Sequence, residues 1–414
     1  MKFAHLADTH LGYRQYGLFE REKDFYEVFD KVIDKIIEEK VDFVIHSGDL
    51  FETARPSPMA LLTFQKGLLK LKGAGIPMYA IAGNHDVVMR KGSIPPHVIF
   101  KKLGLKVIST INPTYMHGDI FIAGLPYYPA SHGKAMKSKL AELSEKASHH
   151  EKSILVLHQG IDKYFPMNFE LEIGEIPDNF DYYALGHIHK YVNDAYGKGR
   201  MVYPGSGEIW KTSEIPDYKK NGKGFVVVDF DGSKPVVKRV TVDIPREFIE
   251  RKIEYDNLES GIASVKETIK DFDKKPILRL SITDVKSDTS GIYEIINDEL
   301  GDLALMIRPT FKMEDDDDLP IDIDTENPLG PPQLLEKQLE EYRNGEATTL
   351  GVDLYHMLSK DKIDESREII NQYFDENFTS SVEDSEFEAE ELEMDQPPEE
   401  KEDIQVTFDK EVSK

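Results

Sequence analysis

Five short clusters of polar residues carry side chains that can bind a divalent metal ion. The clusters are Asp8-Thr9-His10, Gly48-Asp49, Gly83-Asn84-His85-Asp86, His158-Gln159-Gly160 and Gly186-His187-Ile188-His189. Carboxylate, amide and imidazole groups together suit manganese, iron, zinc or cobalt. Two neighbouring ions that share a bridging carboxylate need about this number of side chains, and such a pair is typical of two-metal hydrolytic sites. The candidate ligands are Asp8, His10, Asp49, Asn84, His158, His187 and His189.

The combination of clusters carries this interpretation, because one histidine after a strand is more often a core or surface residue. Asp-x-His or His-x-His alone also occurs often by chance. Here each cluster follows a segment with strand character, and the carboxyl ends of strands are where ligands bind in open α/β sheets. Glycines at positions 48, 83, 160 and 186 let the backbone turn tightly and approach an ion or a phosphate.

The elements that would position these clusters alternate between short apolar runs and helical patterns. Apolar residues at positions 25, 28, 29, 32, 33, 36 and 37 have the spacing of one helix face. Strands alternating with helices indicate an α/β fold built in layers. We expect helices over 25–40 and 60–71, and strands over 2–7, 41–46, 77–82, 120–124, 153–157, 182–185, 201–203 and 225–230.

The pattern changes near residue 235 and predicts further segments. We expect a second, small α+β domain with strands over 236–244, 277–282 and 303–307 and helices over 258–272 and 291–300. The helical patterns after residue 331 are too few for a deep core, so they either dock on a partner or form a marginal hairpin. The expected segments are a catalytic domain over 1–235, the α+β domain over 236–313, an acidic linker over 314–330, a helical segment over 331–378 and a disordered acidic tail over 379–414.

The net charge of −26 is concentrated at the C-terminal end of the chain. Residues 375–414 hold 16 acidic and 3 basic side chains, and residues 314–326 hold 8 acidic side chains and no basic one. Residues 1–313 are therefore almost neutral, so the composition does not exclude a DNA-binding face there. The absence of cysteine excludes disulfides, thiolate metal sites and a cysteine nucleophile. Without a signal-peptide or membrane-span pattern, we expect a soluble, cytoplasmic protein.

The clusters resemble the five motifs of calcineurin-like metallophosphoesterases. A closer resemblance is to the family of DNA double-strand-break repair nucleases called SbcD in bacteria and meiotic recombination eleven in archaea and eukaryotes. It covers residues 1–210 and implies a four-layer metallophosphoesterase β-sandwich flanked by helices, followed by a capping domain. The stretches that carry it are Ala7-Asp-Thr-His-Leu-Gly12, Ser47-Gly-Asp-Leu-Phe51, Arg55-Pro-Ser-Pro58, His158-Gln-Gly160 and Tyr203-Pro-Gly-Ser206.

The resemblance also implies roles for individual residues. Asp49 would bridge two Mn²⁺ ions, one held by Asp8, His10 and His189 and the other by Asn84, His158 and His187. A metal-bound hydroxide would attack phosphorus. His85 would be the catalytic histidine rather than a ligand, and would protonate the leaving 3′ oxygen. Asp86 would either orient the imidazole of His85 or cap the following turn.

One position departs from the family pattern. Relatives in archaea often have a histidine shortly after the Gly-Asp-Leu-Phe run, near the substrate phosphate, where this chain has Glu52. A carboxylate there would repel phosphate unless it turns away or caps a turn. The departure bears on one substrate contact and on the balance of exonuclease and endonuclease activity.

Candidate DNA contacts follow the first three metal motifs. Basic and aromatic side chains there can touch phosphates, which supply affinity without sequence specificity; an ordinary charged loop is the alternative for each. The candidates are Tyr13, Arg14, Tyr16, Arg55, Arg90 and Lys91. A basic stretch around Trp210 is either a rim of the site or a solvated loop; it comprises Lys211, Lys219, Lys220 and Lys223.

The resemblance implies a manganese-dependent DNA nuclease of double-strand-break repair, with 3′→5′ exonuclease activity on duplexes and endonuclease activity on single strands. It implies a homodimer in the nucleoid of a prokaryote, archaeal by its closer motifs, with a coiled-coil, SMC-like ABC-type ATPase bound near residues 331–378. The apolar residues of 25–36 are compatible with a dimer face or with core packing. Alternatives are a phosphatase or small-molecule phosphodiesterase of the same superfamily, and a non-catalytic scaffold for the ATPase.

Overall fold

The computed structural model describes residues 1–87, 94–166, 168–232, 234–286 and 289–313, together with residues 350, 351, 354, 366, 369, 370 and 373. Its contacts divide the chain into two units, Met1–Asp322 and Ile323–Lys414. The linker expected over 314–330 and the tail expected over 379–414 lie outside the described residues, as does nearly all of the helical segment expected over 331–378.

The first sheet combines four strands from the N-terminal part of the chain with two that return to it later. Its strands are β1 (Lys2–Leu6), β2 (Phe43–Ser47), β3 (Met78–Ile81), β4 (Lys106–Val107), β11 (Lys223–Asp229) and β12 (Val236–Val242). The order is β12-β11-β1-β2-β3-β4, with β1 to β4 parallel and β11 antiparallel to β1. We expected residues 236–244 to begin the second domain, but β12 pairs along its whole length with β11. The first body therefore extends to Val242.

The second sheet packs face to face on the first. Its strands are β5 (Thr114–His117), β6 (Ile120–Gly124), β7 (Lys152–His158), β8 (Tyr182–Gly186), β9 (Val192–Tyr196) and β10 (Gly199–Tyr203). The order is β5-β6-β7-β8-β10-β9, and β6, β7, β8 and β10 are parallel. Apolar side chains from both sheets form one cluster between them, including Phe3 and Phe43 from the first and Ile122, Ile154 and Val156 from the second. The result is a β-sandwich.

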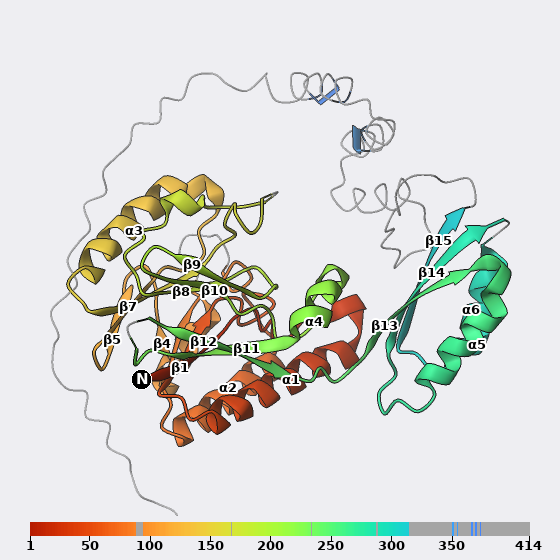
Figure 1. Cartoon of the computed structure of the whole chain (residues 1–414), viewed down its shortest axis with the longest axis horizontal. Helices are drawn as coiled ribbons and strands as arrows, with labels where there is room; N and C mark the ends of the chain where they lie inside the picture. The colour runs from red at the N-terminus through yellow and green to blue at the C-terminus, as the bar shows by residue number, and fades with distance from the viewer. Residues whose placement is uncertain are drawn as a thin grey trace, which may run out of the picture. The chain divides into compact units, whose positions relative to one another are not determined.

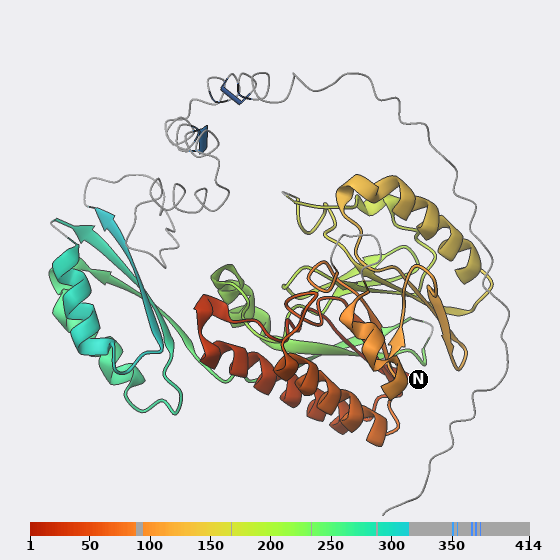
Figure 2. The ribbon, with the colours of Figure 1, turned by 180° about the vertical axis from the view of Figure 1, so that it is seen from behind.

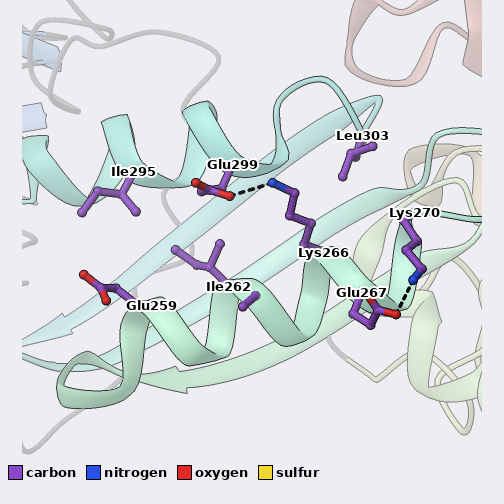
Figure 3. Close-up of a pocket in the computed structure, with 9 residues that line it drawn as sticks. Glu259, Ile262, Lys266, Glu267, Lys270, Ile295, Glu299 and Leu303 are labelled. Atoms are coloured by element: carbon purple, nitrogen blue, oxygen red, sulfur yellow. Dashed lines mark hydrogen bonds and ion pairs between the residues drawn. The ribbon is translucent and has the colours of Figure 1, made fainter.

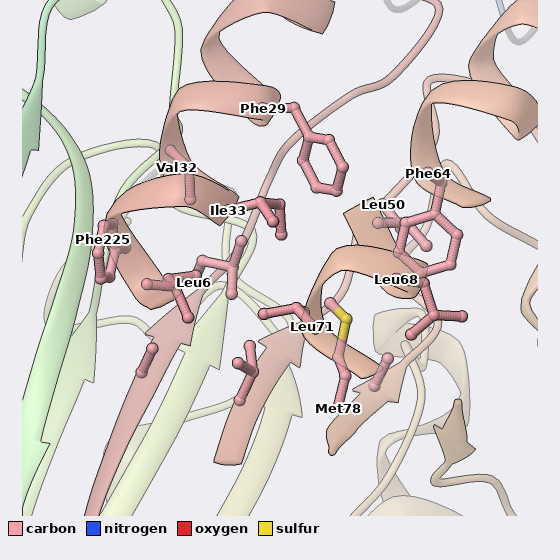
Figure 4. Packing of buried hydrophobic residues seen from close by; sticks show 14 of the residues in the cluster. Leu6, Phe29, Val32, Ile33, Leu50, Phe64, Leu68, Leu71, Met78 and Phe225 are labelled. Atoms are coloured by element: carbon pink, nitrogen blue, oxygen red, sulfur yellow. The ribbon is translucent and has the colours of Figure 1, made fainter. Parts of the chain in front are cut away.

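Helices cover both outer faces of the sandwich and complete the four layers (Figures 1 and 2). The helices are α1 (Phe19–Glu38), α2 (Pro58–Gly73) and α3 (Gly133–Ala147), with the short α4 (Ile215–Asn221). The apolar face of α1 packs with α2 on the first sheet, and α3 packs on the second. Figure 4 shows Phe29, Val32 and Ile33 of α1 facing Phe64 and Leu68 of α2 and the strands beneath.

Helix α2 begins at Pro58, two residues before the expected start at position 60, because Ser57 caps it and Pro58 occupies the first turn. The apolar residues of α1 between positions 25 and 36 are buried in the protein's own core. Core packing is therefore the correct reading of that pattern, and the alternative of a dimer face there is wrong. The layered α/β sandwich flanked by helices that the sequence predicts is confirmed.

Residues beyond Val242 form a small α+β body with its own core. Its elements are β13 (Phe248–Glu254), α5 (Leu258–Ile269), β14 (Ile277–Val285), α6 (Ser290–Leu300) and β15 (Met306–Met313). Three parallel strands lie in the order β13-β14-β15, and both helices cover one face of this sheet (Figures 1 and 2). Strand β13 was missed in the sequence, because its charged residues interrupt the apolar alternation. We call residues 245–313 the capping body.

A surface groove runs between α5 and α6 of the capping body (Figure 3). Its charged side chains pair with one another: Lys266 contacts Glu299 at 2.8 Å, and Lys270 contacts Glu267. Both lysines of the groove are therefore paired, and paired cations offer little to an anion. Among the described residues, no helix is long and apolar enough to cross a membrane.

Candidate metal centre

The predicted ligand clusters lie where parallel strands of both sheets end. Asp8 and Asp49 follow β1 and β2, and Asn84 follows β3, all in the first sheet. His158 is the last residue of β7, and His187 follows β8, both in the second sheet. Because the two sheets are stacked with these ends at the same edge, the structure brings all seven predicted ligands together. Three groups of acidic and histidine side chains there are spaced closely enough to hold a metal ion.

The backbone of the site is strained at four of the predicted ligands. Asp8, His10, Asp49 and His187 have φ values of +52°, +44°, +53° and +92°. Such left-handed conformations are uncommon outside glycine and concentrate at functional sites. The loops also touch directly, because a Cβ atom at Gly83 would overlap the carboxylate of Asp49. Glycine is required there for the second and third clusters to meet.

One ligand group consists of Asp8, His10 and His189. The Nε2 atoms of His10 and His189 lie 3.1 Å apart, and Nε2 of His189 lies 3.9 Å from Asp8 Oδ1. Two imidazole nitrogens that converge in this way can bind the same cation, since metal–nitrogen bonds of about 2 Å place them at such a separation. We call this group the Asp8 side.

The other ligand group consists of Asn84, His158 and His187, with Asp49. Asn84 Oδ1 lies 3.1 Å from His158 Nε2 and 2.9 Å from His187 Nδ1. Asp49 Oδ2 lies 3.1 Å from His158 Nε2 and 3.8 Å from Nε2 of His10, which belongs to the Asp8 side. We call this group the Asn84 side. Asp49 thus stands between the two groups, where a bridging carboxylate would have to be.

Each of the four histidines makes a contact that turns one nitrogen toward the centre. His10 and His189 donate from Nδ1 to Glu52 and Glu214, each at 2.8 Å. His158 donates from Nδ1 to the carbonyl oxygen of Ser47 at 2.8 Å. The remaining nitrogen of each ring is then an acceptor, which is the form that binds a metal. For His187 the outer nitrogen is Nε2, 3.6 Å from Glu170 Oε1.

The charges within the site also indicate a place for cations. Burial opposes the charged form of His158, but Asp49 and Asp8 outweigh it and raise its pKa to about 9. Burial likewise opposes ionisation of Asp49, yet His158 and His10 hold the pKa of that carboxyl below its usual range. Burial and the neighbouring His158 lower the pKa of His187 to about 3. A divalent cation would replace the proton on His158 as the partner of Asp49.

His85 lies beside the ligands without belonging to either side. Its backbone N–H donates to Asp49 Oδ1 at 2.9 Å, and its Nδ1 donates to the carbonyl oxygen of Glu52 at 2.9 Å. The ring stands nearly perpendicular to that of His10, with centroids 4.8 Å apart, and 27% of the side chain is exposed. Nε2 is therefore the nitrogen that can exchange a proton with a substrate.

Asp86 makes its hydrogen bonds to backbone groups of neighbouring loops. The carboxylate is fully buried and accepts hydrogen bonds from the backbone N–H groups of Leu50, Phe51 and Gly83, at 3.1, 2.9 and 2.9 Å. Among the described residues its hydrogen-bond partners do not include the imidazole of His85, and the turn proposed to follow it runs into residues 88–93, which lie outside the described residues. Its function is to hold the Asp49 loop against the Asn84 loop.

The carboxylate of Glu52 is directed at the rings of His10 and Trp210. Its Oε2 accepts from Nδ1 of His10 and from Nε1 of Trp210, the latter at 3.1 Å. The Trp210 ring lies 5.3 to 6.0 Å from those of Tyr13, His10, His189 and His85 and closes one wall of the site.

Sequence reasoning missed Glu214, Glu170 and the role of Trp210. Glu214 accepts from His189 and pairs with the buried Lys223, so Lys223 lies behind the site and belongs neither to a rim nor to a solvated loop. These residues sit in charged or irregular segments whose composition gives no signal. Only their tertiary proximity to a ligand histidine reveals them.

The candidate DNA contacts are placed in different environments. Tyr13 stacks on Trp210, and Tyr16 packs under the guanidinium of Arg308 at 4.9 Å. Arg14 pairs with Glu22 but remains exposed, and Arg55 is exposed as well. Arg90 and Lys91 lie outside the described residues.

Comparison with known proteins agrees with this geometry. The family model described as calcineurin-like phosphoesterase matches residues 1–191. The chain is 37% identical to the DNA double-strand break repair protein Mre11 of Methanococcus maripaludis, over 74% of this chain and 83% of that one. It is 43% identical to Mre11 of Methanocaldococcus jannaschii, over 61% and 69% of the two chains. It is 35% identical to Mre11 of Saccharolobus solfataricus, over 74% and 81%.

The relatives therefore share most of their length with this chain, and the phosphoesterase match covers the segment from β1 to the loop that follows β8, which contains all seven candidate ligands. The chain belongs to the Mre11 family of DNA double-strand break repair proteins, and its residues 1–191 match the calcineurin-like phosphoesterase model.

Proposed function

We propose that this protein is a two-metal DNA nuclease of double-strand-break repair. The observation that carries the proposal is the pair of ligand groups that meet at Asp49, with the imidazole of His85 beside them. Family membership supports the repair role. We further propose manganese as the metal, with 3′→5′ exonuclease activity on duplexes and endonuclease activity on single strands.

The residues divide the chemistry between them. Asp8, His10, His189 and Asp49 would hold one cation, and Asp49, Asn84, His158 and His187 the other. Bound there, two divalent cations supply positive charge for a phosphodiester and lower the pKa of water. His85 is held by its two hydrogen bonds with Nε2 available, so it can stabilise the departing oxygen and give it a proton. Trp210 and Tyr13 exclude water from the side of the site that they cover.

The test is manganese-dependent degradation of a linear DNA duplex by the purified protein, beside His85→Gln. We expect the variant to bind Mn²⁺ as the unaltered protein does and to cleave about 10²- to 10⁴-fold more slowly, the usual contribution of general acid–base catalysis. Hydrolysis of a nucleotide monoester without any cleavage of duplex or single-stranded DNA would contradict the proposal. That result would favour a phosphatase of the same superfamily.

The capping body supports a DNA substrate. Leu278, Leu280 and Ile307 lie in the core under α5 and α6. Because side chains alternate along a strand, their neighbours in sequence lie on the opposite face of the sheet. The opposite face carries the basic side chains of Lys252, Arg308 and Lys312, together with Glu254 and the ion pair that Arg279 forms with Glu250 at 2.9 Å. A basic sheet face suits the phosphates of a duplex. Lys252→Glu and Lys312→Glu should weaken duplex binding uniformly across sequences, measured by fluorescence anisotropy.

We also propose a homodimer, formed through helix α2 rather than α1. Met59, Leu62 and Leu69 of α2 are 51%, 42% and 44% exposed and repeat with helical spacing. An exposed apolar stripe of this kind marks a protein-binding surface. Sedimentation should show a dimer at micromolar concentration and a monomer for Leu62→Glu. A monomeric unaltered protein would contradict the proposal.

The ATPase partner rests on the sequence of residues 331–378 alone. We propose that these residues dock on a coiled-coil ABC-type ATPase, and that the complex acts on DNA in the nucleoid. Deleting residues 327–414 should abolish binding of that ATPase and leave Mn²⁺-dependent cleavage in place. Unchanged binding of the partner by the truncated chain would contradict the docking role.

A further inference from the structure

Two glutamates, Glu52 and Glu214, hydrogen-bond to histidines of the Asp8 side of the metal centre. We infer that the Asp8 side binds the first and more tightly held of the two divalent cations, with Glu52 and Glu214 as positioning residues. The inference rests on the proposed two-metal site, but it concerns metal binding alone and does not depend on the substrate.

The carboxylate of Glu52 holds one imidazole of the Asp8 side. Its contact with His10 Nδ1 is 2.8 Å long, and the same oxygen accepts from Trp210 Nε1 at 3.1 Å. The backbone N–H of Glu52 donates to Leu11 O at 3.1 Å, so the residue is fixed at both ends. A carboxylate on the outer nitrogen fixes the ring and makes the inner nitrogen a stronger ligand. At the position where the family pattern has a histidine beside the substrate, this chain thus has a glutamate that hydrogen-bonds to His10.

The carboxylate of Glu214 holds the other imidazole of the Asp8 side. It accepts from His189 Nδ1 at 2.8 Å and from the backbone N–H of Lys211 at 3.2 Å. Its second oxygen pairs with the buried ammonium of Lys223, which also donates to Ser206 Oγ at 2.6 Å. Glu214 and Lys223 are 3% and 1% exposed, so water does not compete for these contacts. His189 is therefore held by a rigid, buried network.

The Asn84 side has weaker supports. His158 donates to a neutral carbonyl group, that of Ser47, and His187 Nε2 is 3.6 Å from Glu170, beyond an ordinary hydrogen bond. Besides its two histidines and the shared Asp49, this side has the neutral amide of Asn84, whereas the Asp8 side has the carboxylate of Asp8 in the corresponding place. Asp49 is common to both sides, so the Asp8 side has one more negatively charged ligand. In addition, both of its histidines are hydrogen-bonded to carboxylates, those of Glu52 and Glu214. Coulomb attraction in a buried site then favours a cation on the Asp8 side.

Calorimetric titration of the full chain with MnCl₂ tests the order of binding. The unaltered protein should show two binding events of unequal affinity. Asn84→Ala should retain the tighter event and lose the weaker, and His10→Ala should lose the tighter. Two events of equal affinity, or loss of the tighter event in Asn84→Ala, would overturn the inference. No Mn²⁺ binding by the unaltered protein would instead contradict the metal site of the proposed function.

Glu52→Gln tests the positioning role, with Glu170→Gln as the matched control on the Asn84 side. We expect Glu52→Gln to weaken the tighter event about 10- to 100-fold, the usual effect of removing a hydrogen-bonded partner from a ligand histidine. Glu170→Gln should leave that event unchanged. Glu52 is on the edge of the site with 18% of its side chain exposed, so the variant should fold, and its unfolding temperature in EDTA verifies this. An unchanged tighter event in folded Glu52→Gln would refute the role.

Discussion

Replacing Asp86 by asparagine should act mainly by lowering the free energy of unfolding, rather than by altering the chemistry of DNA cleavage. The two carboxylate oxygens accept three backbone hydrogen bonds, one at Oδ1 and two at Oδ2, and the side chain is fully buried. An asparagine of the same shape can present only one oxygen. If that oxygen serves Leu50 and Gly83, the new NH₂ group faces the N–H of Phe51, and that donor is left unsatisfied. The loss of one hydrogen bond to a charged group, with a buried donor left unpaired, costs about 2–4 kcal/mol.

That free energy corresponds to a fall in the unfolding temperature of roughly 4–16 °C for a body of this size. Differential scanning calorimetry in EDTA measures it without a contribution from metal. Mn²⁺ affinity should also fall, because the Asp49 and Asn84 loops are no longer held together. If Asp86→Asn unfolds within 1 °C of the unaltered protein and yet loses DNA cleavage, the clamp is wrong and the carboxylate acts on His85.

Three further predictions concern stability and metal binding. Gly83→Ala should abolish Mn²⁺ binding in calorimetry, because its Cβ would overlap Asp49, whereas Gly73→Ala has open space and should bind normally; normal binding by both would be inconsistent with the packing described. Burial lowers the pKa of His5 to about 3, so below pH 6.5 the unfolded chain takes up the proton more readily than the folded one. As the pH is lowered from 6.5 to about 3, His5 should therefore reduce the free energy of unfolding by ~1.4 kcal/mol for each pH unit. In urea titrations, the free energy of unfolding of His5→Gln should depend less steeply on pH than that of the unaltered protein. Equal pH dependence in the two proteins would exclude His5 as the cause. EDTA should lower the unfolding temperature of the protein and added Mn²⁺ should restore it, since a ligand of the folded state alone stabilises it; no shift would mean that the ions do not bind the folded state.

The sequence predicts which candidate ligands lie together because its signals are local. A ligand cluster directly after an apolar strand identifies both the residue and its place, as Asp8 and His158 show. The supports of the ligands carry no such signal. Glu214 is 25 residues from His189 in the chain, and nothing in its charged neighbourhood distinguishes it from a surface acid. For β12 the alternation identifies a strand but not the sheet that it joins, which depends on pairing with β11.

The sharing of ligands between the sheets gives the cations a mechanical role. Asp8 and His10 come from the first sheet and His189 from the second, and likewise Asn84 comes from the first and His158 from the second. Each ion would therefore cross-link the two sheets at this edge. A displacement of one sheet relative to the other would separate the ligands of both ions. A substitution in the core between the sheets, far from the metal centre, should therefore change the metal affinity. Neither layer alone holds a complete set of ligands, which makes the whole sandwich the smallest unit that can carry the chemistry.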